Sequence, residues 1–546
     1  MPGAEARVAL TEIKDNIDKQ DFIKARLVMD HFPNLTQSEQ KSILFELAKA
    51  TDDFAVPLLC YLVTMNQSIV SEFPTIPDTI SAKAVHSSNI IIEGIAGDVP
   101  ETYYYLKLAG QLNIQKAVPN LIKKLLKTEE KRLQLAAITS LGTLANPDAI
   151  NAITEFLYVD DSELIRAAIT ALGQIATPTA IQRLSAKFGI NQDTDFQILD
   201  IFAEIQDDIS LRKLNETLQS RSAQNRNHAR LKLTKIGIKA VPMLIENLLG
   251  RDSDQQILSL NILQQIGDES AALAIRNLIN NQPKSPNVRF AAFEALADLS
   301  TRKGDYVLAG GLSDPDSNVR LTAAKAIDRN LDKALLNGVK NIVNHPGAEA
   351  INITKAIIDA QTENLFSGLI ESEYFQETAI AYLGQNVHKD IRTFYIDILI
   401  KTKFENLADR IKHLSQSQSK QLKGRVCVVD DSKMVLHLYR SIITELGYEV
   451  ILFSEPLEAI SWLKNNKPDF LCTDLNMPEI TGIELIQEVR KKYSKKALPV
   501  FLVTTQNEIQ DNKAAWKAGV NEIMFKPFDS KIISAAFNKT IEDKNR

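Results

Sequence analysis

Cysteine is scarce in this sequence, which argues against domains that are stabilised by disulfide bonds or by zinc. Only three cysteines occur among 546 residues, at positions far apart in the chain. This pattern indicates neither a disulfide framework nor a zinc site, and it fits a reducing compartment. The seven histidines are likewise scattered without the spacing of a metal site. We therefore expect a cytoplasmic protein.

Long apolar runs are missing as well. No stretch approaches the roughly 18 apolar residues of a membrane-spanning helix, and the first residues lack the apolar core of a signal peptide. The 21 glycines and 19 prolines are too few for a disordered or fibrous chain. The net charge of -5 gives no general attraction to nucleic acid or to an anionic membrane. Because 546 residues exceed what one hydrophobic core can hold, we expect several soluble domains and no membrane span.

The larger part of the chain has the apolar periodicity of helices. From about residue 8 to about 410, apolar residues recur every three or four positions. The segment AITSLG at 137–142 returns as AITALG at 168–173, and NVR at 287–289 returns at 318–320, so both pairs are offset by 31 residues. Helix pairs of this kind bury their apolar faces only by stacking on neighbours. The repeats predict a curved solenoid with a long concave face for a partner.

These units resemble HEAT repeats, especially the short HEAT-like repeats of bilin lyases, in segments such as NVRFAAFEALADLS and DPDSNVRLTAAKAIDR. The resemblance covers roughly residues 112–386 and implies an all-α HEAT-like solenoid over 111–410. Residues 1–110 are expected to form an N-terminal helical cap or subdomain. The likeness to bilin lyases leaves an enzymatic role of the repeats as an alternative, although no cluster of catalytic residues supports it.

A basic stretch lies within the helical region at residues 221–235. It contains Arg226, His228, Arg230 and Lys232 with no aromatic residue between them, which does not indicate a stacking surface for nucleic acid. The stretch is either a patch for an acidic partner or nucleic acid, or a solvated helix face. We favour the solvated helix face.

The pattern changes after the helical region. A polar, Ser/Gln-rich segment predicts a linker at 411–423. Over 424–546, five short apolar runs (RVCVV, EVILF, FLCT, VFLVT and EIMF) alternate with five amphipathic stretches. This alternation predicts an α/β domain with a doubly wound five-stranded parallel sheet. Ligands bind such sheets at the carboxyl ends of the strands.

Charged and polar side chains stand at four of these strand ends. They are Asp430 and Asp431, Asp474, Thr504 and Thr505, and Lys526 and Pro527. Three carboxylates at one edge repel one another, and a hard cation such as Mg²⁺ relieves the repulsion. A cation, a hydroxyl and an ammonium around one carboxylate would neutralise an incoming phosphoryl group. Each feature alone is commonly structural, for example Asp-Asp as a helix N-cap, but their coincidence predicts a phosphorylated aspartate.

The segments VCVVDDSKM, FLCTDLNMPEITGIEL, VFLVTTQ and MFKPF resemble a response-regulator receiver domain of the single-domain chemotaxis type. The resemblance implies that a histidine kinase donates a phosphoryl group, that Mg²⁺ is the cofactor, and that the receiver catalyses only its own phosphoryl transfer and hydrolysis. The roles it implies are Asp474 as phosphoacceptor; Asp430, Asp431, Asp474 and the Asn476 carbonyl as the metal site; Thr504 and Thr505 as hydroxyl and backbone N–H donors; Lys526 as the partner of a phosphoryl oxygen; and Pro527 after a cis bond.

The chain departs from the family pattern at Ile523, where an aromatic switch residue is usual, and at Thr505, where Ala or Ser is common. Asn476 and Gln506 occupy the positions that tune hydrolysis in the family. The face from about Asp511 to Ala536 would report phosphorylation, with Lys513, Lys517 and Lys531 on its outer surface and Ile532, Ile533, Ala536 and Phe537 buried.

Since no DNA-binding domain follows the receiver, we expect phosphorylation to control protein–protein interactions of the solenoid. The alternative is a phosphate sink or phosphorelay receiver that the solenoid only anchors beside a kinase.

Overall fold

The computed structural model describes residues 11–66, 68–299, 306–385, 387–416, 422–477, 479–504 and 509–545. The chain forms two compact units, Met1–Ser210 and Leu211–Arg546. The boundary falls inside the helical repeats, within helix α15 (Asp208–Thr217). The second unit therefore combines the later repeats with the α/β domain.

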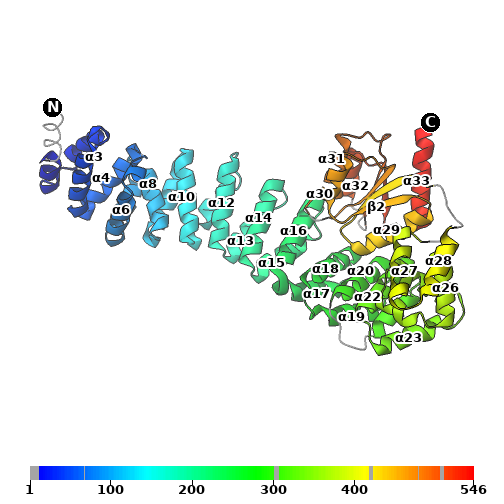
Figure 1. The fold of residues 1–546 in the computed structure, drawn as a ribbon. Coiled ribbons are helices and arrows are strands. Elements are labelled where there is room, and N and C mark those ends of the chain that lie inside the picture. Colours follow the sequence, from blue (N-terminus) through cyan, green and yellow to red (C-terminus); the bar gives the residue numbers. More distant parts are fainter. Residues whose placement is uncertain are drawn as a thin grey trace. The chain divides into compact units, whose positions relative to one another are not determined.

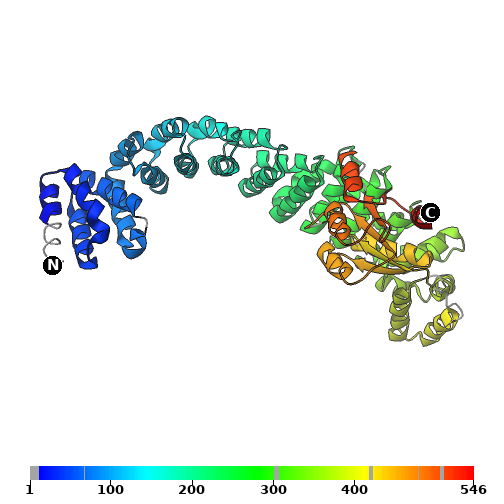
Figure 2. The ribbon, with the colours of Figure 1, turned by 90° about the horizontal axis from the view of Figure 1, so that it is seen from above.

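Unit 1 is a stack of helices in which each second helix of a repeat packs on the next, from α8 through α10 and α12 to α14 (Figures 1 and 2). The Asp161 side chain begins α12 by accepting hydrogen bonds from the backbone N–H groups of Glu163 and Leu164. The helices are α2 (Phe22–His31), α3 (Gln37–Lys49), α4 (Asp52–Met65), α5 (Ile69–Glu72), α6 (Thr75–His86), α7 (Ser88–Ala96), α8 (Thr102–Gln111), α9 (Val118–Lys127), α10 (Lys131–Leu144), α11 (Ile150–Glu155), α12 (Ser162–Ile175), α13 (Pro178–Lys187) and α14 (Gln192–Ile205).

The repeats of unit 2 continue the same design. Asp316 caps α22 through the backbone N–H groups of Asn318 and Val319, and Pro286 occupies the first turn of α20, where a missing N–H costs nothing. The helices are α16 (Ala223–Ile236), α17 (Val241–Leu248), α18 (Ser253–Ile266), α19 (Ala271–Asn280), α20 (Pro286–Asp298), α21 (Tyr306–Gly310), α22 (Ser317–Arg329), α23 (Lys333–Val343), α24 (Ala348–Asp359), α25 (Asn364–Leu369), α26 (Glu373–Gln385), α27 (Lys389–Lys401) and α28 (Glu405–Gln416). Helix α28 thus extends into the segment that the sequence assigns to a linker.

None of the helices in the described ranges combines the length and the apolar character needed to cross a membrane.

The α/β domain is a five-stranded parallel sheet with the strand order β2-β1-β3-β4-β5. Its elements are β1 (Arg425–Val429), α29 (Lys433–Glu445), β2 (Glu449–Phe453), α30 (Pro456–Leu463), β3 (Phe470–Asp474), α31 (Gly482–Arg490), β4 (Val500–Thr504), α32 (Ile509–Ala518), β5 (Glu522–Phe525) and α33 (Ser530–Asn545). The alternation of strands and helices expected from the sequence is confirmed.

The sheet is buried on both faces, because helices pack on each side of it. Successive side chains of a strand point to opposite faces, so each strand contributes to both clusters. On one face Val426 and Val428 join a cluster with side chains of α29 and α33. On the other face Cys427 and Val429 join a cluster with side chains of α30, α31 and α32. Both clusters extend into the solenoid, because Phe290 of α20 packs against the first and Ala223 of α16 belongs to the second. The α/β domain and the later repeats therefore share apolar contacts.

Candidate functional site

The carboxyl ends of β1 and β3 bring two aspartates together. These strands are neighbours in register, with Val429 opposite Thr473, so Asp430 and Asp474 follow at the same edge. Lys526, one residue after β5, reaches back to both: its Nζ lies 2.8 Å from Asp430 Oδ2 and 2.8 Å from Asp474 Oδ1. The backbone N–H of Asn476 donates to the other oxygen of Asp474 at 2.7 Å. Lys526 is thus the counter-ion of two buried carboxylates.

A glycine allows the backbone to pass close to Asp474. A Cβ at Gly482, the first residue of α31, would lie 2.0 Å from the carbonyl oxygen of Asp474. Helix α31 can therefore start against the end of β3 only with glycine at this position.

Burial and mutual repulsion shift the ionisation of this cluster. Burial raises the pKa of Asp430 to about 7, with Lys526 opposing the rise and Asp474 and Asp431 adding to it. Burial also raises the pKa of Asp431, and Arg230 opposes that rise. Burial alone would lower the pKa of Lys526, but Asp430 and Asp474 hold it well above its usual range. Negative charge is therefore concentrated at this edge of the sheet, and cationic groups must offset it.

The structure describes only some of the remaining predicted residues. Thr504 ends β4 and is buried, and its carbonyl accepts the backbone N–H of Lys526 at 2.9 Å. The Lys526–Pro527 peptide bond is cis, as expected. Thr505 and Gln506 lie outside the described residues. Ile523 is partly buried against the cluster that contains Cys427, so an aliphatic side chain packs where the family usually has an aromatic one.

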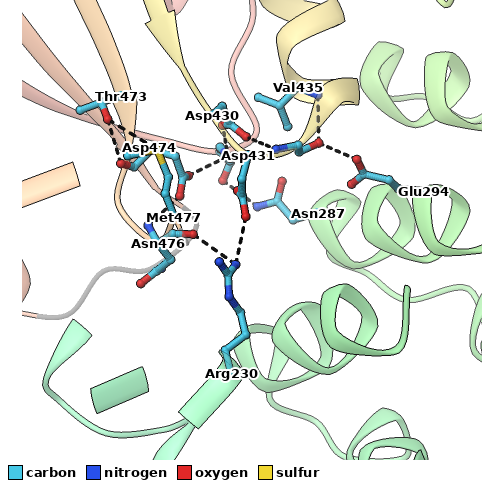
Figure 3. Close-up of polar contacts among 12 residues, drawn as sticks. Arg230, Asn287, Glu294, Asp430, Asp431, Val435, Thr473, Asp474, Asn476 and Met477 are labelled. Carbon is cyan, nitrogen blue, oxygen red and sulfur yellow. Dashed lines mark hydrogen bonds and ion pairs between the residues drawn. The ribbon is translucent and has the colours of Figure 1, made fainter. Parts of the chain in front are cut away.

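An arginine from the solenoid enters the site (Figure 3). Arg230 of α16 places Nη1 3.2 Å from Asp431 Oδ2 and 3.3 Å from the carbonyl oxygen of Asn476. Its side chain is only 3 % exposed. Glu294 of α20 accepts a hydrogen bond from the hydroxyl of Ser432 at 2.5 Å, next to Asp431. Solenoid side chains therefore contact both Asp431 and its neighbour Ser432.

The donor chemistry fits Mg²⁺, because the expected ligands are carboxylate oxygens and one carbonyl oxygen. In the arrangement described, however, no group of three or more Asp, Glu, His or Cys residues within the described ranges is placed to hold a metal ion. Two side-chain cations lie at these carboxylates instead: Lys526 pairs with Asp430 and Asp474, and Arg230 pairs with Asp431. They compensate the negative charge that Mg²⁺ would otherwise offset.

Further contacts hold the α/β domain on the solenoid beside this edge. Asn227 donates to the Met477 carbonyl, Asn287 to the Lys526 carbonyl at 2.7 Å, and Asn318 to the Phe528 carbonyl at 3.3 Å. Arg226 forms an ion pair with Asp511 at the start of α32, at 2.5 Å. We call this set of solenoid side chains the docking face: Arg226, Asn227, Arg230, Asn287 and Asn318.

The structure corrects the interpretation of the basic stretch at 221–235. A solvated helix face was expected, but Arg226 and Arg230 are each 3 % exposed and contact aspartates of the α/β domain. The acidic partner is part of the same chain. The sequence did contain one signal for the docking face, because Asn287 and Asn318 occupy equivalent places in two repeats 31 residues apart.

The structure has a cavity beside the site and a separate groove in unit 1. A polar cavity of about 290 Å³ borders Asp431 and is lined by residues that include Glu294, Lys325 and Arg329. In unit 1, a separate groove of about 580 Å³ is lined by residues that include Tyr103 and Arg132. The groove in unit 1 contains none of the predicted site residues.

The expected reporter surface of the α/β domain is partly as predicted. Lys513, Lys517 and Lys531 are exposed, and Ile533, Ala536 and Phe537 are buried. Ile532 was expected to be buried but is 43 % exposed, because it lies one residue off the inward face of α33.

Comparisons with known proteins agree with this architecture. A family model described as the response regulator receiver domain matches residues 426–538, and a model described as HEAT repeats matches residues 118–198 and 241–328. Both expected families are thereby confirmed. The HEAT match leaves out residues 199–240, which contain α16.

The similar proteins match the α/β domain. The chain is 36% identical over 111 residues to a chemotaxis protein CheY homolog of Campylobacter jejuni subsp. jejuni, covering 20% of this chain and 85% of that protein. It is 31% identical over 122 residues to chemotaxis protein CheY of Pseudomonas aeruginosa, covering 22% of this chain and 98% of that protein. Among solved structures, chemotaxis response regulator CheY4 of Vibrio cholerae is 25% identical, covers 23% of this chain and 99% of that chain, and has a TM-score of 0.20.

Proposed function

This chain belongs to the response regulators that carry a receiver domain, and on that premise we propose that Asp474 accepts a phosphoryl group from a histidine kinase. The observation that carries the proposal is the position of Asp474. It ends the central strand β3, pairs with Lys526 at 2.8 Å, and has Asp430 at the neighbouring strand end. This is the set of groups that transfer of a phosphoryl group to a carboxylate needs.

In the proposed reaction, a carboxylate oxygen of Asp474 attacks the phosphorus atom of a phosphohistidine. An O–P bond forms while the N–P bond to the imidazole breaks, and the imidazole leaves. Lys526 would pair with a phosphoryl oxygen, and Thr504, at the next strand end, would donate its hydroxyl to another. Mg²⁺, when held by Asp430, Asp431, Asp474 and the carbonyl of Asn476, would offset part of the negative charge.

We further propose that this modification controls protein–protein interactions of the solenoid. The support is that the edge bearing Asp474 packs on helices of the repeats, through Arg230 and Asn287. An acyl phosphate would add about -1.5 to -2 charge at this edge, by analogy with other phosphorylated side chains. A change of that size next to a buried arginine and lysine biases the packing of the two parts.

The test is to incubate the intact chain with acetyl phosphate and Mg²⁺ and to locate the added phosphoryl group by mass spectrometry of its peptides. We expect it on the peptide that contains Asp474, and we expect none in Asp474→Asn. Glu479→Gln, which removes an exposed carboxylate of the same loop, is the matched control and should be labelled like the wild type. Labelling that persists in Asp474→Asn contradicts the proposal.

A further inference from the structure

The guanidinium of Arg230 lies against two of the expected ligands of Mg²⁺. Its Nη1 contacts Asp431 Oδ2 at 3.2 Å and the Asn476 carbonyl oxygen at 3.3 Å (Figure 3). We propose that Arg230 replaces the divalent cation while the receiver is docked on the solenoid, so that docking and cation binding exclude each other. This inference rests on the proposed function, because it assigns the regulation of the same site.

The exclusion follows from the chemistry of the two ligands. A guanidinium N–H and a divalent cation use the same oxygen lone pairs of Asp431 and Asn476. Two positive groups in one buried space also repel each other strongly, because little water is present to screen them. Arg230 must therefore withdraw before a cation can bind there. Since α16 carries Arg230, its withdrawal displaces part of the docking face.

The contacts of Arg230 are weak enough for a cation to compete. Nη1 makes both of these contacts, and their distances are at or beyond the upper end of ordinary N–H···O distances. Among the residues that the structure describes, Nε and Nη2 are buried without a hydrogen-bond partner. A bidentate pair would use two nitrogens at shorter distances. A buried charge is costly unless it is well paired and hydrogen-bonded. The packing around Arg230 therefore keeps the guanidinium in place more than its own two contacts do.

The other contacts of the docking face hold the same loops as the site residues. Asn287 binds the carbonyl of Lys526, and Asn227 binds the carbonyl of Met477, one residue after Asn476. A movement of Lys526 toward a phosphoryl group, or of Asn476 toward a cation, therefore strains these hydrogen bonds. Asp474 is only 8 % exposed in the docked state, so undocking also opens the way for a phosphodonor.

The direct test measures Mn²⁺ binding to the intact chain by electron paramagnetic resonance, without any phosphodonor. Arg230→Met should bind Mn²⁺ at least about fivefold more tightly than the wild type, the lower end of ordinary coupling between two sites. Lys235→Met removes the same charge from an exposed place on the same helix and should bind like the wild type. Equal affinity in Arg230→Met and the wild type overturns the inference.

A second measurement keeps Arg230 in place, in case its replacement impairs folding. The native cysteines Cys60, Cys427 and Cys472 are buried, so a single new thiol can be followed with a maleimide. In Ala223→Cys the thiol lies within the apolar contact of α16 with the receiver and should react slowly. We expect Mg²⁺ to speed its reaction, while the exposed thiol of Lys235→Cys reacts at a constant rate. A rate at Ala223→Cys that does not depend on Mg²⁺ contradicts the inference.

The two proposals fail separately. If Arg230→Met binds Mn²⁺ more tightly but acetyl phosphate leaves Asp474 unmodified, the proposed function fails and the exclusion between Arg230 and the cation stands. If Asp474 is phosphorylated but Mn²⁺ affinity is the same in all three proteins, the proposed function stands and this inference fails.

Discussion

Arg226 of α16 and Asp511 of α32 form a buried ion pair, with their side chains 3 % and 8 % exposed. A second nitrogen of Arg226 donates to the carbonyl of Ser220 at 2.7 Å, which fixes the guanidinium on the solenoid side. Asp511 lies in the first turn of α32, the helix that follows β4, and β4 ends in Thr504. The pair therefore joins the solenoid to the face of the receiver that we expect to report phosphorylation.

Replacing one partner of this ion pair should destabilise unit 2 more than replacing both partners. Arg226→Met leaves Asp511 buried without its cation, which costs about 3–5 kcal/mol in comparable buried pairs. The double variant Arg226→Met/Asp511→Leu has no unpaired charge and should recover most of that loss. The measurement is the urea midpoint of the transition that unfolds unit 2. A double variant no more stable than Arg226→Met contradicts the importance of the buried pair.

The two repeated asparagines should each contribute modestly to docking. Asn287→Ala and Asn318→Ala remove donors to the carbonyls of Lys526 and Phe528. We expect each change to weaken the contact by about 1 kcal/mol, and the two losses to add nearly independently. Hydrogen exchange of α20 and α22 measures the effect. Asn341→Ala, at an exposed position of α23, is the control; a similar effect of this control would sink the prediction.

Replacing Lys526 should make the fold depend more on Mg²⁺. Lys526→Met leaves Asp430 and Asp474 without their shared counter-ion, so the metal-free protein should lose about 3–5 kcal/mol of stability. In this variant a bound divalent cation offsets carboxylate charge that no side chain neutralises. The melting temperature should therefore rise more with Mg²⁺ in Lys526→Met than in the wild type. Equal rises in both proteins would show that Lys526 does not compensate these carboxylates.

The contact between α24 and α29 should weaken as the pH rises. Asp359 accepts hydrogen bonds from the hydroxyls of Tyr382 at 3.0 Å and Ser441 at 3.1 Å, and burial raises its pKa to about 7. Its pKa in the unfolded chain is about 3.9, so the folded state binds more protons between these values. The stabilisation is full below about pH 4 and is lost as the pH rises through about 7.

The pH prediction is checked with Asp359→Asn, which cannot ionise. Thermal unfolding of the wild type between about pH 5.5 and pH 8 should show a falling melting temperature, because Asp359 gains its charge in this interval. The fall should be smaller in Asp359→Asn and unchanged in Asp409→Asn, whose carboxylate is exposed. Parallel pH curves for the wild type and Asp359→Asn would assign the pH dependence to other groups.

The receiver could be predicted from the sequence almost to the residue. The run RVCVV became β1 because a strand covered on both faces needs a continuous apolar sequence. The proximity of Asp430, Asp474 and Lys526 could be predicted for a related reason: the carboxyl ends of parallel strands meet at one edge, so order along the chain fixes proximity.

The docking face could not be predicted in the same way. The charges of α16 are typical of a solvated helix, and their partners lie more than 200 residues away in the sequence, as for Arg230 and Asp431. No local periodicity records such a contact. Asn287 and Asn318 were visible as repeated residues, but the repeat itself gave them a sufficient structural explanation. The side chains of the docking face therefore gave no signal of their role. A solvated helix or a repeated residue was already a sufficient explanation for each of them.

The central claim is that modification of Asp474 undocks the receiver from the solenoid, and hydrogen exchange of α16 tests it most directly. The intact chain is compared in Mg²⁺ before and after addition of beryllofluoride, with Asp474→Asn as the control, so that the effect of modification is separated from that of the cation. The account predicts faster exchange over Ala223–Ile236 and over the first turns of α20 and α22, and no change in Asp474→Asn. Unchanged exchange in these helices while beryllofluoride occupies Asp474 would contradict the account and favour a phosphate sink that the solenoid merely anchors.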